Sequence, residues 1–575
     1  MQHFQPDFRF LEDIEVETPN KENILKEAGD IDRQLKEAKT KEEAILAVRR
    51  YFAFIDDIHS MASLIYIRHT IDTRDKKYDS LSDLLNEISP EIDEAVNRIE
   101  SDIYDSPFQK DLKEEFHDLF FRQIALSRKT FSPEIIPDLV EENKLGTEYM
   151  NLISSALIEY KGEKLSISQM GKYTTSLDRE TRKEANALVW KFYSDNDEKI
   201  GDIYSRMIAV RTRIARKLGY EDFVQLGYDR MGRLDWNQND AEEYRKKILD
   251  YIVPLSESIK KAQRERVGLG KEHRYFDDVI FYQSGNPKPK GDTKHLVDAA
   301  MKMYDELSPV ASKYFRFMVD HHCFDLDAKP GKAGGGYMDY IPGLKTSFIF
   351  SNSNGTSQDV DTLTHEFGHA LQGFLGGTNE VPGYRMPGME CCEMHSMSME
   401  FLTYPWMEYF FKEDTDKYLY QHLADAITFI PYGAIVDAFQ TYCYKHPDMT
   451  HQERKAYFRS LEKSYLPSKD YTGNEFLESG GYWMRQHHIF ENPLYYLDYT
   501  IAQVVALEFF RESRIDRSKA LEKYLAFDRL AGTYPFRELL KKAGIGNPLD
   551  GDTLKEVSED AMKYLSSFDL SKIDR

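Results

Sequence analysis

The spacing of apolar residues in the first third of the chain predicts one helix after another. Thr40 and Glu43 have the spacing of an N-terminal capping box. The apolar positions that follow recur every three or four residues, which places them on one helix face. Similar patterns continue to about Lys217, with short polar breaks at Ser106–Pro107 and Ser132–Pro133. The first of these faces consists of Ile45, Val48, Phe52, Ile55, Ile58, Ala62 and Ile65.

The pattern changes between Gly331 and Asn354. A run of three glycines, Gly334–Gly336, opens this segment, and Ser347–Phe350 has the composition of a short strand. Val279–Tyr282 has a similar composition, so the two runs could pair in a small sheet. Helical patterns then resume to the C-terminus. The sequence therefore predicts a mainly α fold with one small β-sheet, placed beside the helix that follows this segment.

The chain has 575 residues, which is too long for one ordinary hydrophobic core. We expect two or more closely packed lobes. No repeat, low-complexity segment or long polar linker marks a boundary between them. The division into an N-terminal helical lobe of residues 1–200 and a second region of residues 201–575 is therefore approximate.

Charge and cysteine content exclude several classes of function. A net charge of -22 argues against binding to nucleic acid or to anionic membranes. Met1–Asp7 has no basic start and no apolar run, and no stretch has the apolar length of a membrane span. The cysteines are too few for a disulfide framework in so long a chain. We expect a cytoplasmic protein, and the oligomeric state stays open. The cysteines are Cys323, Cys391, Cys392 and Cys443.

Two histidines and a glutamate stand on one predicted helix, from Val360 to Leu375. Leu363, Phe367, Ala370 and Phe374 form its apolar face, and Gly376–Gly377 ends it. His365 and His369 are four residues apart, so both imidazoles project from the same side and could fill two corners of a tetrahedral zinc site. Glu366 is placed to accept a proton from zinc-bound water. This H-E-x-x-H pattern predicts a hydrolytic zinc centre.

A catalytic zinc needs a third protein ligand. The downstream acids are Glu380, Glu390, Glu393 and Glu400. Glu380 lies in a loop rich in glycine and proline, where we expect it to be exposed. A helix is predicted to start over Met389–Phe401. Glu393 and Glu400 are seven residues apart on one face of it, so one could bind zinc while the other holds a ligand histidine. The residues alone leave the choice between Glu390 and Glu393 open.

Three segments together resemble the family of thimet oligopeptidase and oligoendopeptidase F, and most closely its bacterial Pz-peptidase branch. They are Thr364–Ala370, Glu393–Glu400 and the stretch from His487 to Tyr499. The motifs cover about residues 331–510. The resemblance implies a mainly helical fold with two lobes flanking a deep substrate channel, and activity on short peptides.

The same resemblance implies specific roles. His365, His369 and Glu393 would hold one Zn²⁺ per chain, with Glu366 as the general base and Glu400 holding a ligand histidine. A histidine and two tyrosines would contact the substrate. Adjacent His487 and His488 make that alignment ambiguous by one residue. We favour His488, with His487 as the alternative, and Tyr496 and Tyr499 as the phenols.

The chemistry of these groups suits peptide hydrolysis. Attack of water on a peptide carbonyl creates an oxyanion, which a phenol O–H or an imidazole N–H can stabilise. Simple aromatic packing is the alternative for each tyrosine. Gly480–Gly481, just upstream, could form a mobile loop or an ordinary turn.

The glycines Gly334, Gly335 and Gly336 could let a substrate backbone approach closely and add to a strand edge, although a plain tight turn explains them nearly as well. The sequence thus predicts a zinc metalloendopeptidase for oligopeptides. The alternatives are a catalytically inactive peptide-binding protein with the same cleft and a zinc enzyme that hydrolyses another amide. The presence of Glu366 argues against an inactive binder, because a binder needs no base there.

Overall fold

The computed structural model describes residues 8–530 and 532–574, so Met1–Asp7 lie outside the described residues. The chain divides into two compact units, each built from three separate segments. The first unit consists of Met1–Arg128, Lys288–Glu413 and Glu512–Ile545, and the second of Lys129–Pro287, Asp414–Arg511 and Gly546–Arg575. Residue 200, the approximate boundary expected from the sequence, lies inside a helix of the second unit.

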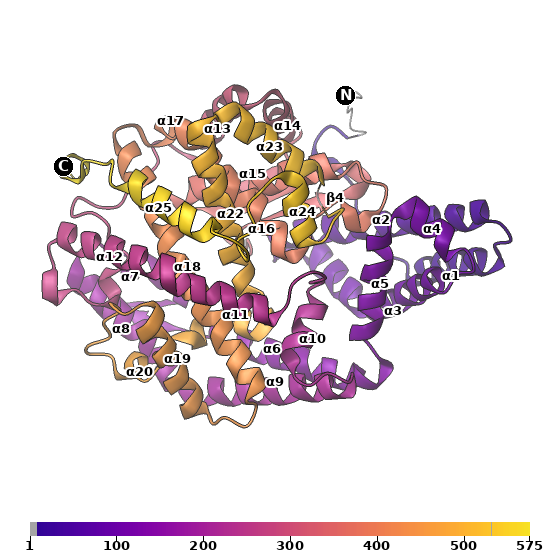
Figure 1. Ribbon diagram of the computed structural model, residues 1–575, viewed down its shortest axis with the longest axis horizontal. Helices are drawn as coiled ribbons and strands as arrows, with labels where there is room; N and C mark the ends of the chain where they lie inside the picture. Colours follow the sequence, from indigo (N-terminus) through magenta and orange to yellow (C-terminus); the bar gives the residue numbers. More distant parts are fainter. Residues whose placement is uncertain (1–7, 531, 575) are drawn as a thin grey trace. The chain divides into compact units, whose positions relative to one another are not determined.

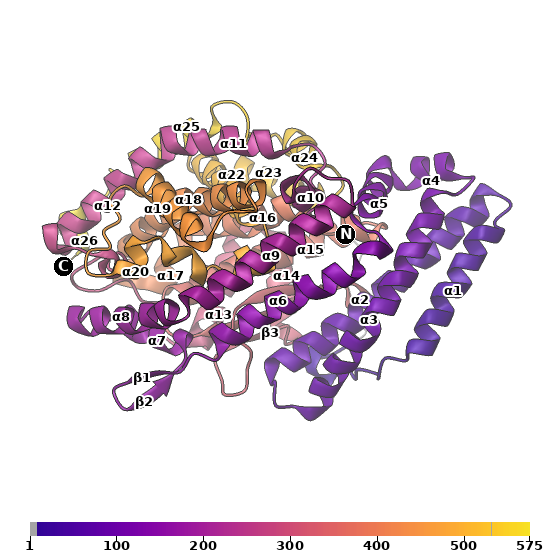
Figure 2. The same ribbon diagram turned by 90° about the horizontal axis from the view of Figure 1, so that it is seen from below.

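Helices dominate the first unit, which confirms the mainly α prediction. Three long N-terminal helices pack on one another, side by side in both ribbon views (Figures 1 and 2). The hydroxyl of Thr40 accepts a hydrogen bond from the backbone N–H of Glu43, at the predicted start of the second of them. The helices of this unit are α1 (Lys21–Glu37), α2 (Lys41–Ile71), α3 (Lys76–Tyr104), α4 (Gln109–Phe116), α5 (Asp118–Thr130), α13 (Thr293–Leu307), α14 (Pro309–Asp320), α15 (Gln358–Gly376), α16 (Met389–Leu402), α17 (Glu408–Phe411), α23 (Arg517–Leu530) and α24 (Phe536–Ala543).

The first unit also contains the predicted small sheet, made of β3 (Phe324–Asp327), β4 (Tyr337–Ile341) and β5 (Thr346–Ser353). The strand order is β3-β5-β4, with β3 parallel and β4 antiparallel to β5. Since β5 is central, its run Thr346–Ser351 is buried without alternation. β4 is an edge strand. Helix α15 packs against β5 and β4, which places the sheet beside this helix, as predicted.

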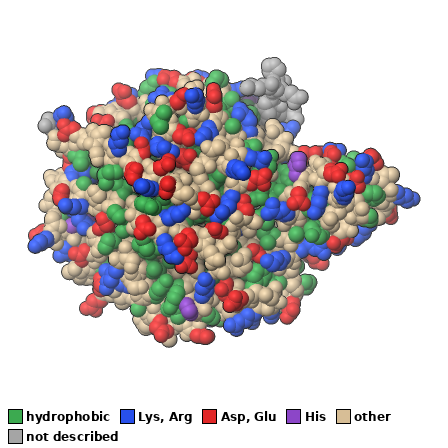
Figure 3. Space-filling view, viewed as in Figure 1, with side chains coloured by type: hydrophobic (Ala, Val, Ile, Leu, Met, Phe, Trp, Pro, Cys, Tyr) green, Lys and Arg blue, Asp and Glu red, His purple; other side chains and the backbone are tan. Residues whose placement is uncertain are grey.

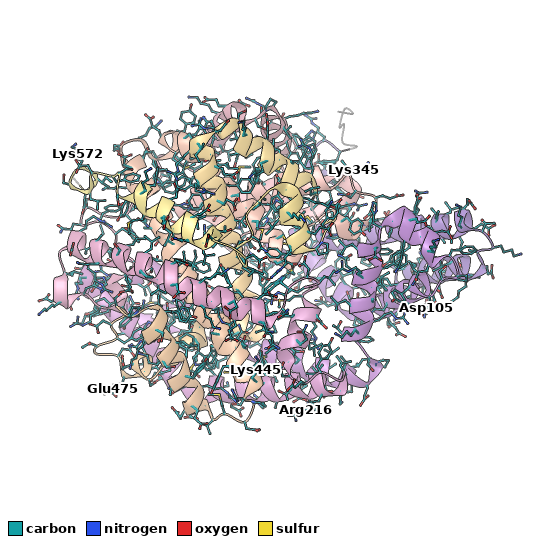
Figure 4. The ribbon with its side chains drawn as sticks, in the orientation of Figure 1. Asp105, Arg216, Lys345, Lys445, Glu475 and Lys572 are labelled. Atoms are coloured by element: carbon teal, nitrogen blue, oxygen red, sulfur yellow. The ribbon has the colours of Figure 1, made fainter. Side chains whose placement is uncertain are left out.

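The second unit is helical apart from a short hairpin, β1 (Ile158–Tyr160) and β2 (Glu163–Leu165). Its helices are α6 (Ile136–Ser154), α7 (Ile167–Thr174), α8 (Arg179–Asp195), α9 (Asp197–Lys217), α10 (Phe223–Arg230), α11 (Gln238–Lys247), α12 (Val253–Val267), α18 (Thr415–Lys445), α19 (His451–Tyr465), α20 (Glu475–Glu478), α21 (His487–Glu491), most of α22 (Tyr496–Ile515), α25 (Thr553–Leu565) and α26 (Leu570–Ile573). Lys445 and Glu475, which end α18 and begin α20, are labelled in Figure 4, where side chains fill the space between neighbouring helices.

The pairing of Val279–Tyr282 with the sheet is wrong. This run belongs to the second unit and forms no strand. Its backbone forms hydrogen bonds with side chains instead of with a neighbouring strand. The side-chain amide of Gln263, for example, donates to the carbonyl of Ile280 at 2.8 Å. The phenol of Tyr282 donates to the carbonyl of Lys417 at 2.9 Å. The apolar composition of the run reflects burial against helices.

Acidic and basic side chains are interspersed on the face drawn in Figure 3. That distribution fits the solvated acidic surface implied by the net charge of -22. Among the described helices, none is both long enough and apolar enough to cross a membrane.

Candidate active site

Helix α15 carries the H-E-x-x-H segment, and its apolar face holds it in the core of the first unit. Phe367 lies 4.2 Å from Tyr304 and 5.0 Å from Phe315, measured between ring centroids. Phe374 stacks on Tyr314 at 4.3 Å. The helix ends at Gly376, as predicted. Because this face is fixed by aromatic contacts with α13 and α14, the opposite polar residues are presented in a defined direction.

Helices α15 and α16 approach each other unusually closely at Gly368. A Cβ atom on Gly368 would lie 2.7 Å from the Cα of Ser396 and 2.8 Å from the carbonyl oxygen of His395. Real Cβ atoms do not approach backbone so closely, so only glycine fits here. Helix α23 supports the pair from another side, since the phenol of Tyr524 donates to the carbonyl of His395 at 2.9 Å. The imidazole of His395 also hydrogen-bonds the buried carboxyl of Asp528 at 2.6 Å.

This close approach brings three potential metal ligands together. The Oε2 atom of Glu393 lies 3.1 Å from Nε2 of His365 and 3.4 Å from Nε2 of His369. One ligand atom from each residue falls within 4.8 Å of the others, and no second such group occurs among the described residues. The hydroxyl of Ser396 donates to the same Glu393 oxygen at 3.1 Å, which orients the carboxylate. Two imidazole nitrogens and one carboxylate oxygen are a donor set that could hold zinc and leave a fourth position open.

The second ring nitrogen of His365 is also occupied. Its Nδ1 atom lies 2.7 Å from Oε1 of Glu400. With a metal on Nε2, the remaining ring proton would reside on Nδ1 and bond to Glu400, which is the tautomer that metal binding requires. Glu400 lies about two turns along α16 from Glu393, on the same face of the helix. The seven-residue spacing therefore lets Glu393 approach Nε2 of His365 while Glu400 approaches Nδ1 of the same ring.

The other acids considered from the sequence lie outside the group of three. Glu390 is buried in the first turn of α16, beside Gly388. Glu380 forms an ion pair with Arg49. Neither residue contributes an atom to the cluster with the two histidines.

Burial and the neighbouring charges set the protonation of the site. Burial lowers the pKa of His365, but hydrogen bonds with Glu393 and Glu400 outweigh it and raise this pKa well above its ordinary value. Burial raises the pKa of Glu393, yet hydrogen bonds with His365 and His369 hold it well below its ordinary value. The carboxylate of Glu393 is therefore kept charged, the form in which it can bind a metal.

Glu366 has a different environment from the other acids. Burial raises the pKa of its carboxyl, although the adjacent imidazoles act in the opposite direction. Within the described residues its carboxylate makes no hydrogen bond, so its oxygens are left to a water or a substrate. A Cβ atom on Gly336 would lie 3.7 Å from Oε1 of Glu366. A raised pKa and free oxygens are the properties of a general base.

The three glycines have different positions around this carboxylate. Gly336 lies against α15 and immediately precedes the edge strand β4. Gly335 has a φ of 93°, which favours glycine, and its carbonyl accepts a hydrogen bond from the amide of Asn352. Gly334 has open space around it. The turn therefore leads the chain into β4 directly beside Glu366.

The second unit gathers the predicted imidazole and phenols. His488 lies 4.9 Å from Tyr496 and 5.7 Å from Tyr499, between ring centroids. His487 points elsewhere, because its Nδ1 lies 3.1 Å from the sulfur of Met150 and its ring packs edge-on against Tyr149. Of the two adjacent histidines, only His488 joins the tyrosines. Burial raises the pKa of Tyr496, so its phenol keeps its proton.

Two further residues, Tyr432 and Gln486, belong to this second cluster without having been predicted from the sequence. The phenol of Tyr432, on α18, donates to Oε1 of Gln486 at 3.0 Å, and Nε2 of Gln486 lies 2.7 Å from Nδ1 of His488. The ring of Tyr432 lies 5.9 Å from that of Tyr496. Gln486 directly precedes the two histidines, which is the only signal the sequence offered. Nothing in the sequence links Tyr432 to them.

The paired glycines just upstream have a packing role. A Cβ atom on Gly480 would lie 1.9 Å from the carbonyl oxygen of Lys455, and Gly480 has a φ of 95°. A Cβ atom on Gly481 would lie 2.4 Å from the ring of Phe476. Close packing thus accounts for both glycines without a mobile loop.

Comparison with known families agrees with this arrangement. The model of the family described as "Peptidase family M3" matches residues 172–559, and that of the "Peptidase M3 N-terminal domain" matches residues 11–131. The chain belongs to peptidase family M3. The family resemblance expected from the sequence is confirmed.

Several relatives of this M3 peptidase are known. A solved structure of Pz peptidase A with an inhibitor is 41% identical, covers 97% of this chain and 100% of its own, and superposes with a TM-score of 0.91. The oligoendopeptidase F homolog of Borreliella burgdorferi is 21% identical, over 92% of this chain and 94% of its own. Oligopeptidase PepF of Bacillus subtilis is 22% identical over 65% of this chain, and the match spans 55% of PepF.

The contact at Gly368 yields a prediction about stability. In Gly368→Ala the added Cβ must push α16 away from α15, which we expect to destabilise the M3 peptidase by ~1–3 kcal/mol despite the better helix propensity of alanine. Urea unfolding of parent and variant measures the difference.

Gly29→Ala is the matched control for this substitution. Gly29 also lies within a helix of the first unit, but a Cβ there would meet nothing within 4 Å. This variant should gain up to ~1 kcal/mol. Equal behaviour of the two variants would show that the close approach of α15 and α16 does not constrain residue 368.

Proposed function

We propose that this M3 peptidase is a zinc-dependent endopeptidase that hydrolyses internal bonds of short oligopeptides. The observation that carries the proposal is the convergence of His365, His369 and Glu393 next to the buried carboxylate of Glu366. The donor set fits zinc, and Glu400 on the far nitrogen of His365 adds the support that zinc-binding histidines usually have. When bound, zinc would supply a Lewis acid that polarises the scissile carbonyl and makes water more acidic.

Glu366 is the general base in this mechanism. Its carboxylate takes a proton from the attacking water and then passes that proton to the amine that leaves. The raised pKa of Glu366 suits both steps, because the acid must release the proton as readily as it accepts it. A protein that only binds peptides has no need for an acid with free oxygens at this position.

His488, Tyr496 and Tyr499 are proposed to position the substrate and to stabilise the oxyanion. The assignment rests on the family resemblance and on the chemistry of the groups. Tyr496 suits a donor role, because its phenol is protonated and hydrogen-bonds no described residue. His488 is preferred over His487 because only His488 contacts the tyrosines.

The edge strand β4 is the proposed binding element for the substrate backbone. An edge strand offers backbone N–H and C=O groups to an extended peptide, so recognition depends little on side chains. Gly336 brings the chain into β4 next to Glu366, where a side chain would crowd a bound peptide. The expected substrates are therefore extended oligopeptides of varied sequence. A cytoplasmic location stays a prediction.

The role of Glu366 is tested by Glu366→Gln. Glutamine has nearly the same shape but cannot accept the proton, so kcat should fall by at least ~10²–10⁴ while the zinc content stays at one per chain. Metal analysis and hydrolysis of a quenched fluorescent peptide measure the two properties. A metal-loaded variant with near-normal turnover would falsify the general-base assignment.

The third ligand is tested by comparing three glutamates of α16. Glu393→Ala should lose zinc much more readily than the parent in a chelator titration, because it removes one of three protein ligands. Glu390→Ala should hold zinc about as well as the parent, and Glu400→Ala should fall between them, with affinity reduced by ~10–100-fold. If Glu390→Ala released zinc before Glu393→Ala, the ligand assignment would have to be reversed.

The phenol of Tyr496 is tested by Tyr496→Phe, which keeps the ring and removes the O–H. An interaction made chiefly in the transition state should appear as a loss of ~10²–10³ in kcat with KM little changed. Tyr499→Phe is the paired variant, and melting curves of both report on packing. A lower Tm with unchanged kcat would return Tyr496 to a packing role.

A further inference from the structure

A cavity of about 340 Å³ lies in the second unit, and none of the residues assigned so far lines it. Its wall includes Trp190 on α8, Tyr275, and Tyr482 and Arg485 from the short 3-10 helix Gly481–Arg485. Cavities of this size accommodate small ligands or the side chain or terminus of a larger one. The mixture of aromatic and charged groups on its wall indicates that a bound group would be polar.

Arg485 is the unusual charge in this cavity. It is exposed to solvent there, and within the described residues it forms no ion pair with an aspartate or glutamate. Its guanidinium lies 5.5 Å from the ring centroid of Tyr482, and Nη1 lies 3.3 Å from the phenol oxygen of that residue. In a chain with a net charge of -22, a guanidinium without an acidic partner is not explained by folding alone.

The other charged groups of the cavity are at least partly balanced. Lys469 forms an ion pair with Asp278 at 2.6 Å. Asp425 accepts a long hydrogen bond of 3.4 Å from Gln421. Burial raises the pKa of Asp425 and so favours its neutral form, while the charge of Lys260 acts on the same carboxylate. Arg485 in contrast contacts the phenol of Tyr482 and no acidic side chain of the described residues.

The phenol of Tyr482 is a suitable partner for the same ligand. Its oxygen accepts from Nη1 of Arg485, which leaves its own O–H to donate to a bound group. A guanidinium fork beside a phenol O–H is an arrangement that binds a carboxylate through charge-assisted hydrogen bonds. The cavity therefore favours an anion over a cation.

A row of rings links Arg485 to the proposed substrate contacts. Tyr482 lies 5.8 Å from Tyr432, Tyr432 lies 5.9 Å from Tyr496, and Tyr496 lies 4.9 Å from His488. All of these residues belong to the second unit. A peptide held against His488 and Tyr496 can therefore reach the cavity with a neighbouring part of its chain.

We propose that Arg485 and Tyr482 form a subsite that binds a carboxylate of the peptide substrate. The carboxylate comes from the C-terminus of the peptide or from an aspartate or glutamate side chain. The subsite rests on the proposed peptidase function and adds a specificity to it. It makes the enzyme favour peptides that carry a negative charge which Arg485 can bind.

The test compares matched peptides on the zinc-loaded enzyme. One arm compares a peptide that ends in a free carboxylate with the same peptide ending in an amide. The other arm compares amidated peptides that carry either Gln or Glu at one position, and it tests each position in turn. Hydrolysis is followed by mass spectrometry. We expect one arm to show a preference of ~10-fold or more in kcat/KM for the carboxylate, the size of one charge-assisted hydrogen bond at a partly exposed site. The responding arm identifies the source of the carboxylate.

Variants then connect that preference to Arg485. Arg485→Gln should reduce the preference to near one while leaving the hydrolysis of the amidated Gln peptide largely unchanged. Arg485→Lys keeps the charge without the fork and should retain part of the preference, and it remains informative if Arg485→Gln folds poorly. Asp425→Asn, on the same cavity wall, is the matched control and should keep the full preference.

Two results would overturn the subsite. One is a parent enzyme that cleaves all matched peptides equally well, and the other is a full preference in Arg485→Gln. Fluorescence anisotropy of a labelled free-acid peptide and its amide, each bound to Glu366→Gln, separates this failure from that of the proposed function. If the zinc-loaded parent cleaved no peptide but Glu366→Gln bound the acid more tightly than the amide, the function would be rejected and the subsite kept. Cleavage by the parent without any preference would do the reverse.

Discussion

The close approach of α15 and α16 at Gly368 is the constraint on which the rest of the site depends. His365 and His369 lie on one helix and Glu393 on the other, so their ligand atoms meet only if the two backbones nearly touch. A Cβ at Gly368 would lie 2.7 Å from the backbone of Ser396, only three residues from Glu393. A small shift of α16 would therefore move the carboxylate away from both imidazoles. Helix α23 opposes such a shift, through the hydrogen bonds of Asp528 and Tyr524 to His395.

The pKa values of the two acids of this site shift in opposite directions, although both carboxyl groups are buried, because their partners differ. Glu393 is surrounded by two imidazoles and the hydroxyl of Ser396, and these contacts keep it ionised in spite of burial. Glu366 is adjacent in space but has no hydrogen-bond donor among the described residues, so desolvation dominates and its pKa rises. One carboxylate is thus suited to hold a metal and the other to exchange a proton, a separation of roles that arises from environment and not from residue type.

The sequence predicted the parts of the fold that depend on local spacing. The apolar faces of α2 and α15, the end of α15 at Gly376 and the helix from Met389 all follow from patterns within a few turns. The choice between Glu390 and Glu393 could not be made this way, because both lie on α16 and only its contact with α15 distinguishes them. His487 and His488 are neighbours on the short helix α21, so their side chains point in different directions. No rule of sequence spacing tells which of the two faces Tyr496 and Tyr499. The prediction that Val279–Tyr282 forms a strand failed because burial against helices and burial in a sheet require the same apolar residues.

The surroundings of His488 show how groups distant in sequence could prepare a donor for the oxyanion. Tyr432 stays protonated and donates to Oε1 of Gln486, which turns the amide N–H₂ of Gln486 toward Nδ1 of His488. In that arrangement Nδ1 accepts a hydrogen bond, so the proton of the neutral imidazole resides on Nε2. His488 then presents an N–H beside the phenol O–H of Tyr496. Both groups would be neutral donors, which can stabilise a developing negative charge without first losing a proton or repelling Arg485.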